Sequence, residues 1–145
     1  IADVLRQHGA DAPRDLEDLW RRMVLTVLIS NTDDHLRNHG FLYDGVRGWR
    51  LSPAYDLNPV PADIKPRVLT TALTLDGDPT ASLDLALESA ESFGLDAPGA
   101  RVIARSVAGV AASWREVARG FGIATKEIER MASAFEHEDL RAALA

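Results

Sequence analysis

Residues 13–30 read PRDLEDLWRRMVLTVLIS and predict one long helix at the centre of the fold. Pro13 suits a first helical turn, and the acidic residues Asp15 and Glu17 are favourable near a helix N-terminus. Apolar residues recur at steps of three and four, the spacing of one buried helical face; they are Leu16, Leu19, Trp20, Met23, Val24, Val27 and Leu28. The second half is apolar on nearly every side, so we expect it to be buried in a larger core.

A very polar segment, NTDDHLRNHG at residues 31–40, follows this helix. It is too polar to be core and too poor in strong helix formers to extend the helix. Phe41–Tyr43 and Trp49–Leu51 then read as two short strands around a turn that contains Asp44 and Gly45. We therefore expect a polar loop with a small β-hairpin beside it.

Beyond the hairpin, a proline-rich loop leads to a possible strand and then to further helices. Val68–Leu75 is the candidate strand, closed by a turn at residues 76–79. Ser82 is placed to cap a helix that runs through Phe93, with Gly94 at its stopping position. A longer helix is expected from about Pro98 to Arg119, and a last one from Thr125. Their predicted inner faces carry Ile103, Val107, Val110, Ala111, Trp114 and Phe121 in the first, and Ile128, Met131 and Phe135 in the second.

The composition fits one mainly α domain over residues 1–145, a helical bundle with a small β-hairpin. The chain has 145 residues, 46% of them hydrophobic, which is enough for a real core. There is no apolar run of about 18 residues, so no membrane span is expected. Zero cysteines fit a reducing, cytoplasmic setting. Because the first residue is Ile1, we expect the chain to begin inside a longer gene product.

The formal net charge of −6 argues against direct nucleic-acid binding, which needs clustered basic residues. Most of the basic residues are arginines, and only Lys65 and Lys126 are lysines. Four arginines of the predicted long helix are expected on its solvated face: Arg101, Arg105, Arg115 and Arg119.

The polar loop and the hairpin carry the residues that suggest chemistry. Asn38 stands five positions after Asp33, and Asp56 follows the hairpin 23 positions after Asp33. Protein kinases use an Asp, an Asn five residues later and an Asp beyond a hairpin. Phosphoryl transfer needs a carboxylate that accepts the proton of the attacking hydroxyl, and Mg²⁺ prefers carboxylate and amide oxygens.

The sequence at this point resembles the HipA-like serine/threonine kinases. The run at residues 31–38, NTDDHLRN, and the run at residues 51–57, LSPAYDL, look like that family's Thr-Asp-x-His-x-Lys-Asn segment and its Leu-Thr-Pro-x-Tyr-Asp segment. Arg37 stands where the family usually has Lys, which replaces a point cation with a planar fork. Ser52 stands where the family commonly has Thr.

The resemblance implies a protein-kinase-like C-terminal lobe and a role for each matched residue. Asp33 would be the catalytic base, and Asn38 and Asp56 would hold Mg²⁺. The residues expected against ATP are His35, Leu36, Arg37, Asn38, Tyr55 and Asp56. For His35 we favour orienting the loop through a hydrogen bond to a backbone carbonyl. Many proteins of this kind are toxins of toxin–antitoxin modules, so the resemblance also implies a protein substrate of the translation machinery and an antitoxin-like DNA-binding partner.

The features that grip ATP are not found in these 145 residues. The sequence contains no Gly-x-Gly-x-x-Gly run, and no lysine precedes Lys65. Kinases need a glycine-rich loop over the phosphates and a strand lysine. We therefore expect the N-terminal ATP-gripping lobe to be absent and this chain alone to be inactive.

Two other classes of function remain open at the level of sequence. The first is a metal-dependent phosphoesterase that uses Asp33, Asp34, His35 and His39; the two histidines are four apart, but a third zinc ligand is not evident. The second is a partner-binding module without catalysis. The kinase hypothesis predicts oxygen ligands only, whereas the binding module predicts that Asp33→Asn and Asp56→Asn are silent.

Overall fold

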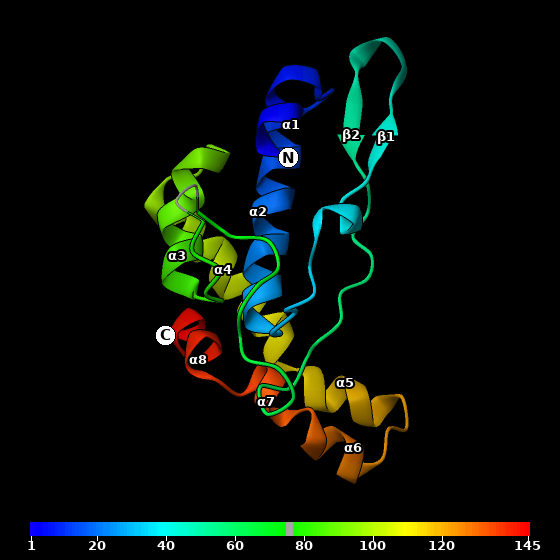
Figure 1. Cartoon of the computed structure of the whole chain (residues 1–145), viewed down its shortest axis with the longest axis vertical. Coiled ribbons are helices and arrows are strands. Elements are labelled where there is room, and N and C mark those ends of the chain that lie inside the picture. Colours follow the sequence, from blue (N-terminus) through cyan, green and yellow to red (C-terminus); the bar gives the residue numbers. More distant parts are fainter. Residues whose placement is uncertain (75–76) are drawn as a thin grey trace.

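The predicted central helix is present as α2 (Ala12–Leu28), which runs along the middle of the molecule (Figure 1). The computed structural model describes residues 1–74 and 77–145. The fold is mainly helical, with one two-stranded antiparallel sheet. The other α-helices are α1 (Ala2–His8), α3 (Leu83–Ser89), α4 (Ala97–Ala112), α5 (Trp114–Gly120), α6 (Thr125–Arg130), α7 (Ala132–Phe135) and α8 (Glu138–Leu144). The shorter elements are the 3₁₀ turns η1 (Leu36–Asn38), η2 (Gly45–Arg47) and η3 (Ala90–Phe93) and the strands β1 (Phe41–Tyr43) and β2 (Trp49–Leu51).

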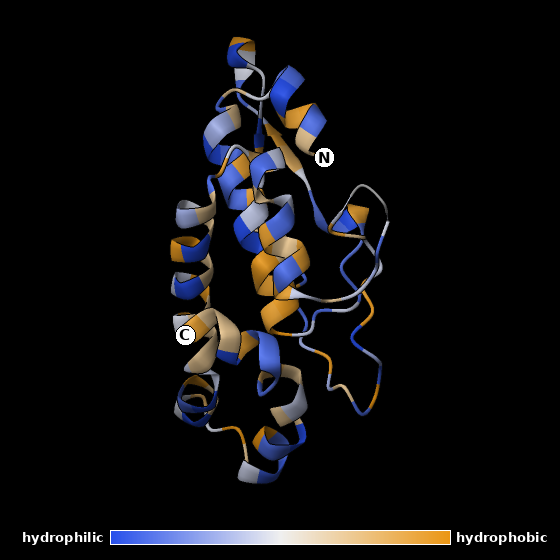
Figure 2. Cartoon of the chain, turned by 90° about the vertical axis from the view of Figure 1, so that its left-hand side faces the viewer, coloured by the Kyte–Doolittle hydropathy of each residue, from blue (hydrophilic) through white to orange (hydrophobic). Residues whose placement is uncertain are grey.

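The main core forms where α2 packs against α3, α4 and α8. Trp20, Val24 and Val27 of α2 are fully buried in it. Small residues of α4 face them and allow a close approach of the helices; they are Ala100, Ala104, Ala108 and Ala111. The indole Nε1 of Trp20 donates to the carbonyl oxygen of Ala86 at 2.9 Å, which fixes α3 against α2. Most helices carry both hydrophobic and hydrophilic residues (Figure 2), so the core is built from one side of each.

The hairpin is confirmed, with Phe41 opposite Leu51 and Tyr43 opposite Trp49. The Tyr43 and Trp49 rings lie 5.1 Å apart between centroids.

A buried carboxylate, Asp15 of α2, holds the hairpin to the body of the protein. Arg50 Nε donates to both oxygens of Asp15, at 2.9 and 3.1 Å, and Leu51 N donates at 2.9 Å. Burial would raise the pKa of Asp15, but these hydrogen bonds outweigh it and hold the pKa below its ordinary value.

The helix predicted from Ser82 to Phe93 is present, although its last turn is the 3₁₀ turn η3. The Ser82 hydroxyl accepts a hydrogen bond from Leu85 N at 3.4 Å. Gly94 ends the element with φ at +77°, a left-handed conformation that glycine adopts without a steric penalty. The short helices α1 and α8 show no strong apolar periodicity and are not predicted from the sequence.

The range predicted as one long helix, Pro98 to Arg119, is helical but forms two helices, because the helix is interrupted at Ser113 between α4 and α5. The Ser113 hydroxyl donates to the carbonyl of Val110 at 2.8 Å, a local bond that competes with a continuing helix. The change of direction leaves Val110 73% and Phe121 85% exposed, against the prediction that both are buried. Trp114 instead stacks on Phe135 of α7, with ring centroids 4.5 Å apart.

Two further predictions about this half of the chain are corrected. Arg115 is not simply solvated, since it forms ion pairs with Glu136 and Glu129, and these raise its pKa. The strand predicted at residues 68–75 is reduced in residues 68–74 to an isolated bridge between Val68 and Thr80. Residue 75 and the first residue of the predicted turn, 76, lie outside the described residues.

None of the helices in residues 1–74 and 77–145 combines the length and the apolar character that a membrane crossing requires.

We predict that Asp15→Ala lowers the free energy of unfolding by about 1–3 kcal/mol at pH 7, because the buried Leu51 N–H loses its acceptor. The contribution of the lowered pKa is present above the ordinary value of 3.8 and is lost as the pH falls through the folded-state pKa. The difference between the two proteins should therefore shrink below about pH 3.8. Urea unfolding across this pH range measures it.

Asp3→Ala is the matched control, since the Asp3 side chain is 84% exposed in its ion pair with Arg6. Exposed pairs contribute little, so we expect no measurable change. Equal losses in both variants would contradict the anchoring role of Asp15.

Candidate functional site

The polar loop begins where the buried helix α2 ends, at a residue in the left-handed backbone conformation. Ser30 has φ at +53° and is fully buried, and the next two residues, Asn31 and Thr32, are buried as well. The chain turns sharply here and then emerges at Asp33, whose side chain is 74% exposed. The turn thus converts the end of a core helix into a surface loop within three residues.

A second stretch, residues 60–71, runs along this loop and satisfies its backbone; we call it the bracing segment (Figure 1). The Ser30 carbonyl accepts from Val60 N at 3.2 Å. The Thr32 carbonyl accepts from the Thr70 hydroxyl at 3.0 Å and from Lys65 Nζ at 3.2 Å. The Asp34 carbonyl accepts from the Thr71 hydroxyl at 3.0 Å. The carbonyls of Ser30, Thr32 and Asp34 therefore each have a donor in the bracing segment.

Asn38 and Asp56, the two residues predicted as metal ligands, are in direct contact. Asn38 Nδ2 donates to Asp56 Oδ2 at 2.5 Å, although the residues lie on either side of the hairpin. The other carboxylate oxygen of Asp56 accepts from Asn58 Nδ2 at 2.6 Å, a partner that the sequence did not reveal. Asn38 Oδ1 accepts from the backbone N–H of His35 at 3.1 Å. Amide and carboxylate oxygens are the types of ligand that Mg²⁺ prefers. Here the amide nitrogen of Asn38, and not its oxygen, faces Asp56, so the two oxygens would meet at one ion only after the Asn38 amide turns.

Asp56 itself has φ at +58°, a conformation that non-glycine residues seldom adopt. Asp and Asn tolerate it better than other residues because their short polar side chains bond locally. Strained backbone of this kind is concentrated at functional sites. The conformation supports a special role for position 56.

Asp33, the predicted base, lies in the same loop as Asn38 but makes no hydrogen bond to Asn38 or Asp56 in the described part of the chain. Lys65 lies beside it, with Nζ 4.0 Å from Asp33 Oδ1. The structure therefore joins the two predicted metal ligands directly and leaves the predicted base exposed a few residues away. No sequence motif pointed to Lys65.

Residues 35–37 and Tyr55, predicted to lie against the nucleotide, are brought together. The Tyr55 hydroxyl donates to the Arg37 carbonyl at 2.8 Å, and Leu36 is well exposed. The prediction that the His35 ring bonds a backbone carbonyl is wrong: its Nε2 lies 3.1 Å from an Arg37 guanidinium nitrogen. The loop is oriented instead by the backbone N–H of His35, through Asn38.

A buried carboxylate–imidazole pair, Asp34 and His39, lies behind the loop, with Oδ2 and Nε2 3.1 Å apart. Among residues 1–74 and 77–145, no three His, Cys, Asp or Glu side chains are grouped closely enough to hold a metal. The phosphoesterase hypothesis needs such a group from Asp33, Asp34, His35 and His39. Of these four side chains, those of Asp34 and His39 are in direct contact.

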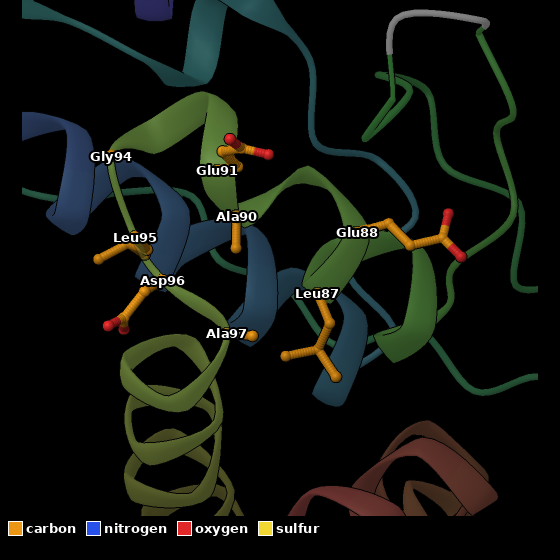
Figure 3. Close-up of a pocket in the computed structure, with 8 residues that line it drawn as sticks. All are labelled: Leu87, Glu88, Ala90, Glu91, Gly94, Leu95, Asp96 and Ala97. Carbon is orange, nitrogen blue, oxygen red and sulfur yellow. The ribbon is translucent and has the colours of Figure 1, made fainter.

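A separate hollow of about 550 Å³ lies between η3 and the start of α4 (Figure 3). Glu88, Glu91 and Asp96 line it, and their carboxylates point in different directions in that view. None of the predicted site residues belongs to it. It adds no chemistry to the polar loop.

A protein-family model, the HipA-like C-terminal domain, matches residues 1–135. The chain belongs to the HipA-like C-terminal domain family.

Two curated relatives agree with this assignment. A Sinorhizobium fredii protein named "Putative kinase Y4dM" is 37% identical over 70 residues, which cover 48% of this chain and 14% of that protein. A Haemophilus influenzae protein named "Putative kinase" is 29% identical over 86 residues, which cover 57% of this chain and 25% of that protein. The matched part thus spans a quarter or less of each relative. No solved structure is a significant match.

We predict that Asp56→Ala lowers the free energy of unfolding by about 1 kcal/mol more than Asp56→Asn does, since Asn tolerates the left-handed backbone and both variants lose the carboxylate that accepts from Asn38 and Asn58. Urea unfolding of the two variants measures the difference. Asp84→Ala is a suitable control for the loss of an exposed carboxylate in an ordinary helix. An Asp56→Ala variant as stable as Asp56→Asn would show that position 56 carries no conformational constraint.

Proposed function

We propose that this chain is the catalytic part of a HipA-like protein serine/threonine kinase, with the architecture of a kinase C-terminal lobe. The observation that carries the proposal is the contact between Asn38 and Asp56, which joins two motif residues from opposite sides of the hairpin. Family membership and the names of the two relatives support it. The mainly helical fold with one hairpin beside the loop is compatible with such a lobe.

In this proposal Asp33 accepts the proton of a Ser or Thr hydroxyl as the hydroxyl oxygen attacks the γ-phosphorus of ATP. The new oxygen–phosphorus bond forms as the bond between the γ-phosphorus and its bridging oxygen breaks, and ADP leaves with that electron pair. The high exposure of Asp33 lets a protein side chain reach it.

Asn38 and Asp56 would hold Mg²⁺, which when bound neutralises charge on the phosphates of ATP. The amide ligand adds no negative charge, and the carboxylate supplies one. The Arg37–Tyr55 bond would fix the loop on the nucleotide side, because the Tyr55 hydroxyl clamps the backbone one residue before Asn38. These residues bind and orient, whereas Asp33 alone handles the proton.

The substrate and the setting follow from the family alone. We propose a protein substrate of the translation machinery and an antitoxin-like DNA-binding partner, as in toxin–antitoxin modules. The glycine-rich loop and strand lysine that kinases need are not found in these 145 residues. Activity should therefore be measured on the gene product with any sequence encoded upstream of Ile1.

We predict that Asp33→Asn reduces phosphate transfer from ATP by about 10²–10⁴-fold, the usual contribution of a general base. Because Asp33 is exposed, the variant should unfold at the same urea concentration as the parent. Transfer from γ-labelled ATP to protein, including the protein itself, measures the effect, with Asp84→Asn as the control.

Full activity of both Asp33→Asn and Asp56→Asn would refute the kinase proposal. It would favour the partner-binding module instead, which needs neither carboxylate.

A further inference from the structure

Lys65 places an ammonium group beside the proposed catalytic base. Its Nζ donates to the carbonyl oxygen of Thr32 at 3.2 Å and lies 4.0 Å from Asp33 Oδ1. Thr32 and Asp33 are adjacent, so the cation bridges the buried end of the loop and its exposed carboxylate. The Lys65 side chain remains 45% exposed, which leaves it open to a ligand on the Asp33 side.

The turn that carries Lys65 is fixed by contacts of its own. The backbone N–H groups of Ile64 and Lys65 both donate to the Pro61 carbonyl, at 2.9 and 3.2 Å. Ser133 of α7 holds the turn from outside: its hydroxyl oxygen accepts from Ala62 N at 3.1 Å and donates to an Asp63 oxygen at 3.0 Å. The backbone that carries the Lys65 side chain is therefore held in place, and this restricts where the ammonium group can lie.

Lys65 is not needed to hold the loop in place. The Thr70 hydroxyl donates to the same Thr32 carbonyl at 3.0 Å, and neighbouring donors satisfy the carbonyls of Ser30 and Asp34. A threonine would meet the same structural need without a charge. A lysine has three donors, and the Thr32 carbonyl takes only one of them.

The reaction proposed above develops negative charge close to Asp33. A phosphoryl group that passes to a hydroxyl at Asp33 spreads negative charge over its equatorial oxygens. A lysine is a compact cation that suits a phosphate oxygen as a point charge. The same cation lies 4.0 Å from Asp33 Oδ1, close enough to attract the carboxylate.

We propose that Lys65 is a further catalytic residue, which orients the Asp33 carboxylate and binds an oxygen of the phosphoryl group in transfer. The inference rests on the kinase function proposed above. The proposed role of Lys65 adds a cation from the bracing segment to the site. The other site residues, Asp33, Asn38 and Asp56, lie before and after the hairpin.

The test compares Lys65→Met with two matched variants in the gene product that includes any upstream sequence. Thr70→Ala removes the neutral hydrogen bond to the same carbonyl, and Lys126→Met removes the other lysine of the chain, which lies on α6. Transfer from γ-labelled ATP gives kcat and the KM for ATP, and urea unfolding gives the stability of each variant.

Lys65→Met should lower kcat by about 10²–10³-fold, the usual effect of removing one electrostatic stabiliser, with KM for ATP changed by less than about threefold. Lys65→Arg should recover part of the lost kcat because it restores the charge. Thr70→Ala and Lys126→Met should each keep kcat within about threefold of the parent, since both leave that stabiliser in place.

An active Lys65→Met beside an inactive Asp33→Asn would overturn the role of Lys65 and leave the kinase function standing. Equal losses in Lys65→Met and Thr70→Ala would also overturn it, because they would show that only the loop hydrogen bonds matter. Full activity of both Lys65→Met and Asp33→Asn would instead refute the underlying function.

Discussion

Where the chain emerges from the buried end of α2, each backbone carbonyl still needs a hydrogen-bond donor. The rest of the site depends on the residues that supply these donors. A buried carbonyl that loses its partner costs free energy, so every such group needs a donor. The carbonyls of Ser30, Thr32 and Asp34 find theirs in the bracing segment, which arrives from a distant part of the sequence. The loop is thus held by hydrogen bonds from the bracing segment, and Asp33 stays exposed beside Lys65 of the same segment.

The elements with strong local signals could be predicted from the sequence. The apolar periodicity predicted α2, two short strand-like runs around a turn with Asp44 and Gly45 predicted the hairpin, and Ser82 and Gly94 marked the ends of α3 and η3. The break at Ser113 could not be read, because a serine in a helical pattern reveals its bond to Val110 only in the folded chain. The strand expected near Val68 is reduced in residues 68–74 to one bridge; the adjacent Thr70 and Thr71 side chains both bond the polar loop, whereas adjacent side chains of a strand point to opposite faces.

The candidate site was likewise predictable only in part from the sequence. The motif residues Asn38 and Asp56 were identified by their spacing, and the structure places them in contact. The spacing of the motif residues gave no indication of Asn58, whose amide donates a hydrogen bond to the second oxygen of Asp56. Lys65 was equally hidden, since it approaches Asp33 only through a turn docked on α7. Contacts between segments far apart in sequence have no local signal, and these are the contacts that complete the site.

The end of the chain participates in this arrangement through Arg67. Its guanidinium bonds the Ser30 hydroxyl, the Val27 carbonyl and Asp139 of α8, and Asp139 also accepts from Leu83 N. Ser30 in turn donates to the Ala134 carbonyl of α7. One cation thus connects the final two helices with the last turn of α2. A change at Asp139 will consequently be felt at Ser30, where the polar loop begins, more than a hundred positions earlier in the sequence.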